Sequence, residues 1–214
     1  FFRTPSKEMW YVAGVFAGDG DVSAHNNSIS LEWKISDYDH LITIKNFLAE
    51  AVPAKVRQRE GRDYCRFFIY DSQLHDDLIQ LGITPKKSFK LQLPDIPDKY
   101  FWDFTRGIFD ADGSISKTTG KRKPAYPSFK ITNNEIFLTQ LKKAIESRLK
   151  IQFAKLYIYP YSTHPTIKTA ELKISGRGAM KVLRTMYKDS PEDLRLNRKY
   201  EIFKTWTNDI RYVD

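Results

Sequence analysis

The chain contains one internal repeat, and this repeat limits the possible folds more than any other feature of the sequence. Residues 10–20 read WYVAGVFAGDG and residues 103–113 read DFTRGIFDADG. Each segment predicts a helix that stops at its last glycine, since glycine tolerates the left-handed conformation found just past a helix end. Two copies therefore predict two halves with the same order of elements. Aligned 93 positions apart, the copies share Gly14 and Gly107, Phe16 and Phe109, Asp19 and Asp112, and Gly20 and Gly113.

The residues that follow each copy predict strands and helices in a matching order. Polar and apolar residues alternate at 28–35, and a hairpin is expected over 54–70 with its turn at 60–63. In the second half we expect strands at 126–132, 151–159 and 166–174. Helices are expected near 39–51, 72–81, 133–149, 178–188 and 192–208, the last with Ser190 as its N-cap and Pro191 at its first position.

These elements predict an α+β protein with two αββαββα halves, residues 1–94 and 95–214. The joint falls at residues 94–98, where two prolines prevent a continuous helix or strand. Each half is expected to form a four-stranded antiparallel sheet with one apolar and one polar face. Small residues recur four apart in the motif helices, which allows two backbones to approach closely and by itself predicts only a packed helix pair: Gly14 with Gly18, and Gly107 with Ala111.

The charge of the chain favours an anionic partner. The formal net charge is +9 at pH 7, and nucleic acid is the first expectation for such a balance. Residues 1–96 hold 12 Lys and Arg against 13 Asp and Glu, whereas residues 97–214 hold 23 against 13. The single cysteine, Cys65, excludes a disulfide framework and a cysteine-rich zinc site. No apolar run reaches the roughly 18 residues of a membrane span and no targeting segment is visible, so we expect an intracellular protein (cytoplasm or organelle matrix).

The polar faces of the two predicted sheets carry many long cationic side chains. A plain solvated face is one reading of this pattern. A DNA-facing surface is the reading that we favour, because β-ribbons can enter the major groove, where arginine matches the edge of guanine. The expected DNA-binding residues are Ser30, Glu32, Lys34, Lys55, Arg57, Arg59, Arg62, Tyr64 and Arg66 in the first half, and Ser116, Lys130, Lys155, Tyr157, Lys168 and Lys173, with Tyr159 beside them, in the second.

The two repeated aspartates predict chemistry as well as packing. A carboxylate in the last turn of a helix faces the negative end of the helix dipole, which costs about 0.3–1 kcal/mol. If the two helices pack side by side, repulsion between Asp19 and Asp112 adds to this cost. A divalent cation turns both penalties into attraction. Mg²⁺ suits such a site, because it is commonly bound by one or two carboxylates together with substrate phosphates.

The two segments ending in Asp19-Gly20 and Asp112-Gly113 resemble the signature motifs of the LAGLIDADG homing endonucleases, in their single-chain, two-motif form. Residues 82–88 (GITPKKS) and 194–200 (LRLNRKY) are similar to the lysine-bearing segments near the end of each repeat in that family. The resemblance covers nearly the whole chain. The first copy departs from the usual pattern at Ala17 and Gly18, where an acidic residue is frequent at the first of these positions.

The resemblance implies a monomer that cuts both strands of a long double-stranded DNA target, typically on behalf of an intron. It implies that the motif helices form the central interface and that the sheets form a DNA-binding saddle. Asp19 and Asp112 become metal ligands, with the carbonyls of Gly18 and Ala111 as helpers, and Lys87 and Lys199 become catalytic candidates with Lys86 and Arg198 as their rivals. The cofactor implied is Mg²⁺, with Mn²⁺ or Ca²⁺ as substitutes for binding.

Other functions remain open at this point. A DNA- or RNA-binding protein on the same scaffold, such as an intron maturase or a regulator without cleavage, would carry much the same sequence. An intein context is a third possibility, although the chain has neither a starting Cys or Ser nor a terminal His-Asn for splicing. The histidines show no metal-ligand spacing, which disfavours a histidine-bound metal: they are His25, His40, His75 and His164.

Overall fold

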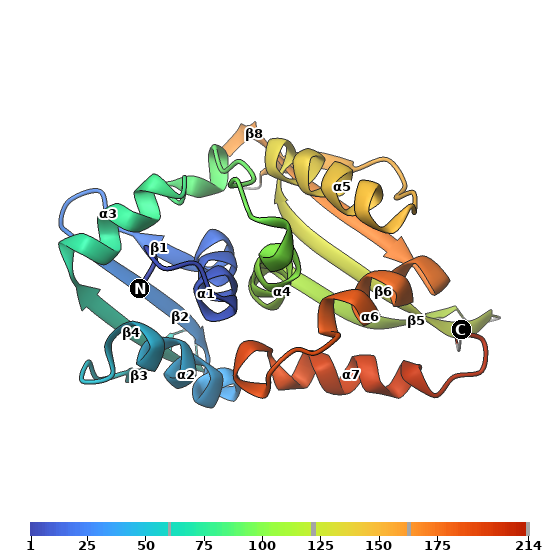
Figure 1. Cartoon of the computed structure of the whole chain (residues 1–214), viewed down its shortest axis with the longest axis horizontal. Coiled ribbons are helices and arrows are strands. Elements are labelled where there is room, and N and C mark those ends of the chain that lie inside the picture. Colours follow the sequence, from blue (N-terminus) through green and yellow to red (C-terminus); the bar gives the residue numbers. More distant parts are fainter. Residues whose placement is uncertain (60, 121–122, 162–163, 213–214) are drawn as a thin grey trace. The chain divides into compact units, whose positions relative to one another are not determined.

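The structure is a computed structural model that describes residues 1–59, 61–120, 123–161 and 164–212. Figure 1 follows the chain from α1 to α7. The first half consists of α1 (Lys7–Gly18), β1 (Gly20–Val22), β2 (Ser28–Lys34), the 3₁₀ turn η1 (Ile35–Asp37), α2 (Tyr38–Ala49), β3 (Lys55–Arg59), β4 (Arg62–Tyr70) and α3 (Ser72–Gln80). This is the αββαββα order expected from the repeat.

The second half repeats this order and adds a helix. Two 3₁₀ turns, η2 (Lys87–Phe89) and η3 (Asp98–Tyr100), precede it. It consists of α4 (Phe101–Asp112), β5 (Gly113–Gly120), β6 (Lys123–Asn134), α5 (Glu135–Leu149), β7 (Tyr157–Tyr161), β8 (His164–Ser175) and α6 (Gly176–Tyr187), followed by the 3₁₀ turn η4 (Glu192–Leu194) and α7 (Asn197–Thr207).

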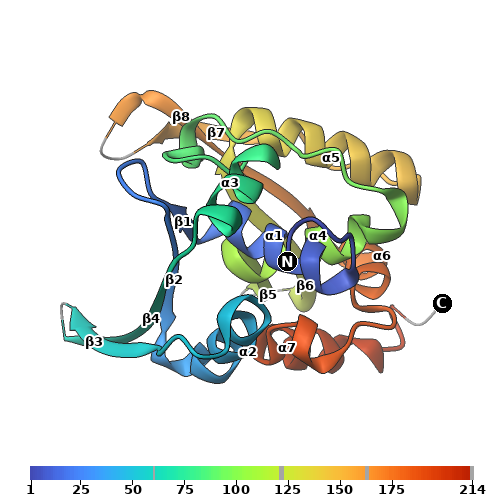
Figure 2. The same cartoon turned by 60° about the vertical axis from the view of Figure 1, so that its left-hand side comes forward.

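The two sheets are antiparallel and have equivalent topologies. Their strand orders are β1-β2-β4-β3 and β5-β6-β8-β7. The inward face of the first sheet is buried under helices through Ile29, Leu31, Cys65 and Phe67. In Figure 2, α1, α2 and α3 all lie on one side of this sheet. The second sheet buries Phe129, Ile131, Ala170 and Leu172, and α5 and α6 pack on it.

Side-chain caps explain where several helices begin. The Ser6 hydroxyl accepts a hydrogen bond from the Met9 amide (3.1 Å) at the start of α1. Asp71 and Asn134 do the same for the Leu74 and Phe137 amides at the starts of α3 and α5 (both 2.9 Å). Such caps satisfy amides that have no partner inside the helix.

The chain forms two compact units, and they do not follow the two sequence halves. The first comprises Phe1–Lys87, Pro94–Ala111 and Pro191–Leu196, and the second comprises Ser88–Leu93, Asp112–Ser190 and Asn197–Asp214. Helix α4 therefore belongs, up to Ala111, to the same unit as α1 and the first sheet. The reason is that α4 packs closely on α1.

The predicted strand at 151–159 is wrong in its first part, since β7 begins only at Tyr157. The Phe153 amide donates to the Glu146 carboxylate of α5 (2.7 Å), and the Phe153 ring packs edge-on against Phe129. An amide committed to a helix side chain is not available to a strand ladder. Lys155 consequently lies before the strand rather than on it.

The start predicted for the last helix is also wrong. Ser190 is not its N-cap and Pro191 is not its first residue, because α7 begins at Asn197. Pro191 instead precedes the η4 turn, and Arg195 is extended, with φ −156° and ψ 145°. Hydrogen bonds that α4 makes with Leu194 and Leu196 keep this segment from continuing as an α-helix.

Candidate active site

The motif helices α1 and α4 meet at their glycines. A Cβ atom on Gly107 would lie 2.9 Å from the Val15 amide nitrogen and 3.0 Å from the Cα of Gly14. A Cβ atom on Gly14 would lie 2.9 Å from the Ile108 amide nitrogen, with the Phe104 carbonyl closer still. Both neighbours are backbone, so no side chain can move aside. The expectation that small residues let these helices approach closely is confirmed at Gly14 and Gly107.

A buried hydrogen-bonded chain ties the two helices together. The Tyr11 hydroxyl donates to Asp110 Oδ2 (2.8 Å) and lies 2.6 Å from His40 Nε2. Since the hydroxyl has one proton and gives it to Asp110, His40 Nε2 must be the donor to Tyr11. Burial lowers the pKa of His40, which favours the neutral imidazole; in that form the proton is on Nε2. In the repeat, Asp110 aligns with Ala17, so the acid of the second copy has a packing role that the first copy lacks.

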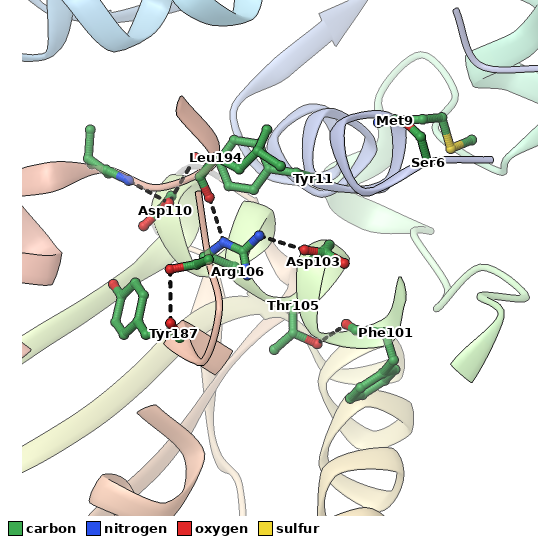
Figure 3. Close-up of polar contacts among 12 residues, drawn as sticks. Ser6, Met9, Tyr11, Phe101, Asp103, Thr105, Arg106, Asp110, Tyr187 and Leu194 are labelled. Atoms are coloured by element: carbon green, nitrogen blue, oxygen red, sulfur yellow. Dashed lines mark hydrogen bonds and ion pairs between the residues drawn. The ribbon is translucent and has the colours of Figure 1, made fainter. Parts of the chain in front are cut away.

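The segment before α7 is held by the same helix. Asp110 Oδ2 accepts from the Leu196 amide (2.8 Å), and Arg106 Nε donates to the Leu194 carbonyl (2.5 Å). Arg106 also pairs with Asp103 at 2.6 Å, and it is only 2% exposed (Figure 3). These contacts explain why residues 191–196 belong to the first unit.

Each motif aspartate accepts a hydrogen bond from a strand residue of its own sheet. In the first unit, the Trp33 indole Nε1 donates to Asp19 Oδ2 (2.7 Å). In the second unit, the Asn133 amide Nδ2 donates to Asp112 Oδ2 (2.6 Å). Asp19 is exposed, and Asp112 is half-buried. Both carboxylates thus have one oxygen oriented by a fixed donor.

The two donors occupy equivalent positions. Leu31 pairs with Gly20 in the first sheet, and Ile131 pairs with Gly113 in the second. In each sheet the donor lies two residues further along the same strand, so it points to the same face as the paired residue. The repeat therefore reproduces the support of the carboxylate with two different side chains.

A buried lysine binds the backbone next to each motif aspartate. Lys87 Nζ donates to the carbonyl of Gly20, and Lys199 Nζ donates to the carbonyl of Gly113 (2.6 Å). Lys87 is 9% exposed and Lys199 is 3% exposed. A cation at this place is favourable, because the last carbonyls of a helix carry a partial negative charge. The two lysines therefore offset part of the cost of the carboxylates.

The neighbouring cations lie elsewhere. Lys86 and Arg198 are exposed, and Lys86 has a positive φ of 57°. The geometry thus places Lys87 and Lys199, rather than these rivals, at the helix ends. Among the described residues, no group of three or more His, Cys, Asp or Glu is placed to hold a metal ion. Within the same residues, no helix is long and apolar enough to cross a membrane.

An aromatic stack supports Trp33 from behind. The His40 and Trp33 rings are parallel within 6°, with centroids 5.7 Å apart. His40 in turn contacts Tyr11. The side chain that orients Asp19 is therefore joined, through His40 and Tyr11, to the helix pair.

The expected DNA-facing residues of the first sheet share one face. Register pairs Lys55 with Arg66, Arg57 with Tyr64 and Arg59 with Arg62, and it pairs Arg66 and Tyr64 in turn with Glu32 and Lys34 of β2. Directly paired residues point to the same side of a sheet. Lys34, Lys55, Arg57 and Arg62 are exposed. Ser30 lies on this face but is only 2% exposed. The side chain of Arg59 lies outside the described part.

In the second sheet, one expected residue is on the wrong face. Lys173 pairs with Lys130, and Tyr157 pairs with Glu171, so all four share the polar face. Lys168 is an odd number of residues from Lys173 and pairs with Pro160, which places it with the apolar set. The prediction that Lys168 shares the polar face with Lys173 is therefore wrong. Ser116 pairs with Ser128, but the Ser116 side chain lies outside the described residues.

The architecture is that of the LAGLIDADG homing endonucleases. The chain is similar to the meganuclease I-SmaMI bound to uncleaveable DNA, with a TM-score of 0.56 and 13% identity over 91% of this chain and 88% of the other. It is also similar to the DNA-bound LAGLIDADG homing endonucleases I-LtrWI (TM-score 0.54, 14% identity, 93% and 89% coverage) and I-GzeII (0.55, 14%, 95% and 89%). No protein-family profile and no curated protein matches the sequence. At this identity the likeness establishes the fold.

Sequence reasoning missed three residues that shape this site: Trp33, His40 and Asn133. Asn133 had a usable signal, since it is a polar residue at the position where the alternation of β6 calls for an apolar one. The sequence around Trp33 carries no such signal, because its ring is buried as predicted and only its N–H reaches Asp19.

Proposed function

We propose that the protein is a site-specific, double-strand DNA endonuclease of the homing type, acting as a monomer. The observation that carries this proposal is the duplicated helix end. Each copy combines an aspartate, a strand residue that donates to it, and a buried lysine on the next carbonyl. If the motif helices served only to pack together, neither half would need this set of polar groups, and still less would both.

The oxygen atoms available at each helix end fit a hard divalent cation. Asp19 and Asp112 provide carboxylate oxygens, and the carbonyls of Gly18 and Ala111 are further candidates. Mg²⁺ prefers such oxygen ligands and retains several waters and substrate phosphates around it. When bound, it lowers the pKa of a water nucleophile and stabilises charge on the phosphate oxygens. Mn²⁺ or Ca²⁺ would substitute for binding.

The side chains around the carboxylates position them. Trp33 holds one carboxylate oxygen of Asp19, and Asn133 holds one of Asp112. Each carboxylate is therefore already oriented before a cation binds. Lys87 and Lys199 place positive charge beside the helix ends, where it would stabilise negative charge that develops on a bound phosphate. We propose that both lysines act in this way.

DNA would bind along the polar faces of the two sheets. Exposed cations on these faces provide phosphate contacts and base contacts. The proposed DNA-binding set is Glu32, Lys34, Lys55, Arg57, Arg62, Tyr64 and Arg66 in the first sheet and Lys130, Tyr157 and Lys173 in the second. The net charge of +9 supports the same partner.

Substitution of the aspartates tests the proposal. Asp19→Asn and Asp112→Asn keep the size of the side chain but remove its charge, so cutting should be lost while DNA binding in Ca²⁺ remains within a few-fold of the wild type. Asp95→Asn, an exposed aspartate outside the motifs, is the matched control and should cut normally. Cutting by the double variant in Mg²⁺ would refute the assignment.

One observation favours a binding protein without cleavage, such as a maturase or regulator. Lys87 and Lys199 already offset the charge at both helix ends, so the carboxylates are tolerable without a cation. This alternative predicts nucleic-acid binding that is unchanged by a chelator, together with intact DNA in Mg²⁺. The endonuclease predicts cut DNA under the same conditions.

A further inference from the structure

The polar face of the first sheet contains one arginine that differs from its neighbours. Arg66 lies on β4, between Glu32 of β2 and Lys55 of β3. Its guanidinium carbon lies 3.8 Å from the centroid of the Phe68 ring. Its Nη2 donates to the Ser30 hydroxyl (2.9 Å). An aromatic ring and a buried hydroxyl thus hold the guanidinium from two sides.

Phe68 is an apolar residue on a polar face. Its ring is 41% exposed, although the face around it is otherwise charged or hydroxylic. The stacked Arg66 guanidinium accounts for the ring, since arginine is attracted to the face of an aromatic ring and loses side-chain freedom there. Ser30 is 2% exposed, so its hydroxyl is a fixed anchor rather than a mobile one.

Arg57, a second guanidinium of this face, has a different role. It forms an ion pair with Glu32 that links β3 to β2 across β4. Its charge is therefore already matched by a carboxylate. Burial lowers the pKa of Arg66, with Glu32 acting in the opposite direction, so Arg66 is a partly desolvated cation. Desolvation strengthens the hydrogen bonds that such a group makes to a ligand.

The donors of Arg66 are only partly used. A guanidinium has five N–H groups, and among the described residues Ser30 is the acceptor that it reaches. Its Nε is buried and makes no hydrogen bond within the described part of the chain. The remaining N–H groups of Nη1 and Nη2 form the fork that matches the O6 and N7 acceptors of guanine in the major groove.

We propose that Arg66 determines specificity by reading a guanine base, and that Phe68 and Ser30 position its guanidinium. The proposal rests on the proposed function, because it requires DNA on this face. Arg66 would contact the base directly, whereas Phe68 and Ser30 would act through Arg66. A fixed fork gives up little freedom on binding, so it suits a contact of defined orientation such as the paired acceptors of a guanine edge.

Selection from a randomised DNA pool, with binding in Ca²⁺ as the readout, tests this without any need for cleavage. The wild type should enrich sequences with a guanine at a defined position. Arg66→Lys keeps the charge but removes the fork, so preference for that guanine should fall by roughly 5- to 150-fold while other positions are unchanged. Phe68→Leu and Ser30→Ala should weaken the same preference and no other. Arg148→Lys, at an exposed arginine of α5 outside the proposed DNA-binding set, is the matched control and should leave the base preferences as they are.

The outcomes separate the two ideas. If the wild type enriches a sequence and Arg66→Lys retains every preference, the inference fails and the proposed function stands. Uniform weakening across all sequences would assign Arg66 to a phosphate and also overturn the inference. If the wild type enriches no sequence at all, the proposed function fails and the inference with it.

Discussion

Gly107→Ala is the most informative test of how the helix pair is built. In a helix interior this change normally stabilises by about 1 kcal/mol, because alanine is the better helix former. Here the new Cβ atom would lie 2.9 Å from the Val15 amide nitrogen and closer still to the Tyr11 carbonyl. Unstrained heavy-atom contacts require about 3.5 Å, so α1 and α4 must separate by at least about 0.5 Å.

The cost of this separation exceeds the gain in helix propensity. A gap of about 0.5–1 Å already forfeits a quarter to a half of the contact energy of the atoms that line it. Overpacking a core by one methyl group costs about 1–3 kcal/mol when side chains can adjust, and here the obstacle is backbone. We therefore expect a net loss of at least about 2 kcal/mol, which lowers Tm by about 4–8 °C for a chain of this size.

Gly178→Ala is the matched control for Gly107→Ala. Gly178 also lies in a helix, but its new Cβ atom would meet the side chain of Ile174, which can change its rotamer. Stability should stay the same or rise by up to about 1 kcal/mol. Urea unfolding of the two variants and the wild type measures the difference. Equal stability of Gly107→Ala and Gly178→Ala would refute the close backbone contact between α1 and α4.

Three further predictions concern the buried polar groups. Tyr11→Phe should destabilise by about 1–3 kcal/mol in urea unfolding, because it removes a buried hydrogen bond, whereas Tyr100→Phe, which loses an exposed one, should change stability by less than about 0.5 kcal/mol; equal effects would contradict the buried network. Burial lowers the folded-state pKa of His40 below its ordinary value of about 6.5. The contribution of neutral His40 to the free energy of unfolding is therefore present above that pH and is lost as pH falls through the folded pKa. Unfolding midpoints at pH 5 and 7.5 should differ less in His40→Asn than in the wild type, and an unchanged difference would exclude His40 as the cause. Lys199→Met should slow DNA cleavage by roughly 100-fold in a single-turnover assay, and Arg198→Met should leave the rate near that of the wild type; the reverse order would exchange their roles.

The order of the elements could be predicted from the sequence because it depends on local patterns. Alternation at 28–35 placed β2 on its correct face, and the two Asp-Gly pairs marked the ends of α1 and α4. These signals lie within a few residues of the feature that they predict. Alternation assigns a residue to a face only by its position in steps of two, and Lys168 lies an odd number of residues from Lys173, so the two point to opposite faces.

The errors arose where a distant residue decides the local conformation. The segment before α7 is not α-helical because the Leu196 amide donates to Asp110, 86 residues away. Residues 151–156 do not join the sheet because Glu146 takes the Phe153 amide. Neither partner is visible in a local pattern. For the same reason, the sequence could nominate Asp19 and Asp112 but could not find the side chains that orient them.

Selection for cut DNA is the measurement that tests the central claim most directly. The protein is incubated with a randomised duplex pool in Mg²⁺, and the new ends are sequenced; a parallel sample contains a chelator. We predict ends that share one sequence and that appear only with the metal, and no ends from the double Asp19→Asn, Asp112→Asn variant. An intact pool in Mg²⁺, with a bound sequence recovered equally in the chelator, would contradict the account and identify a binding protein.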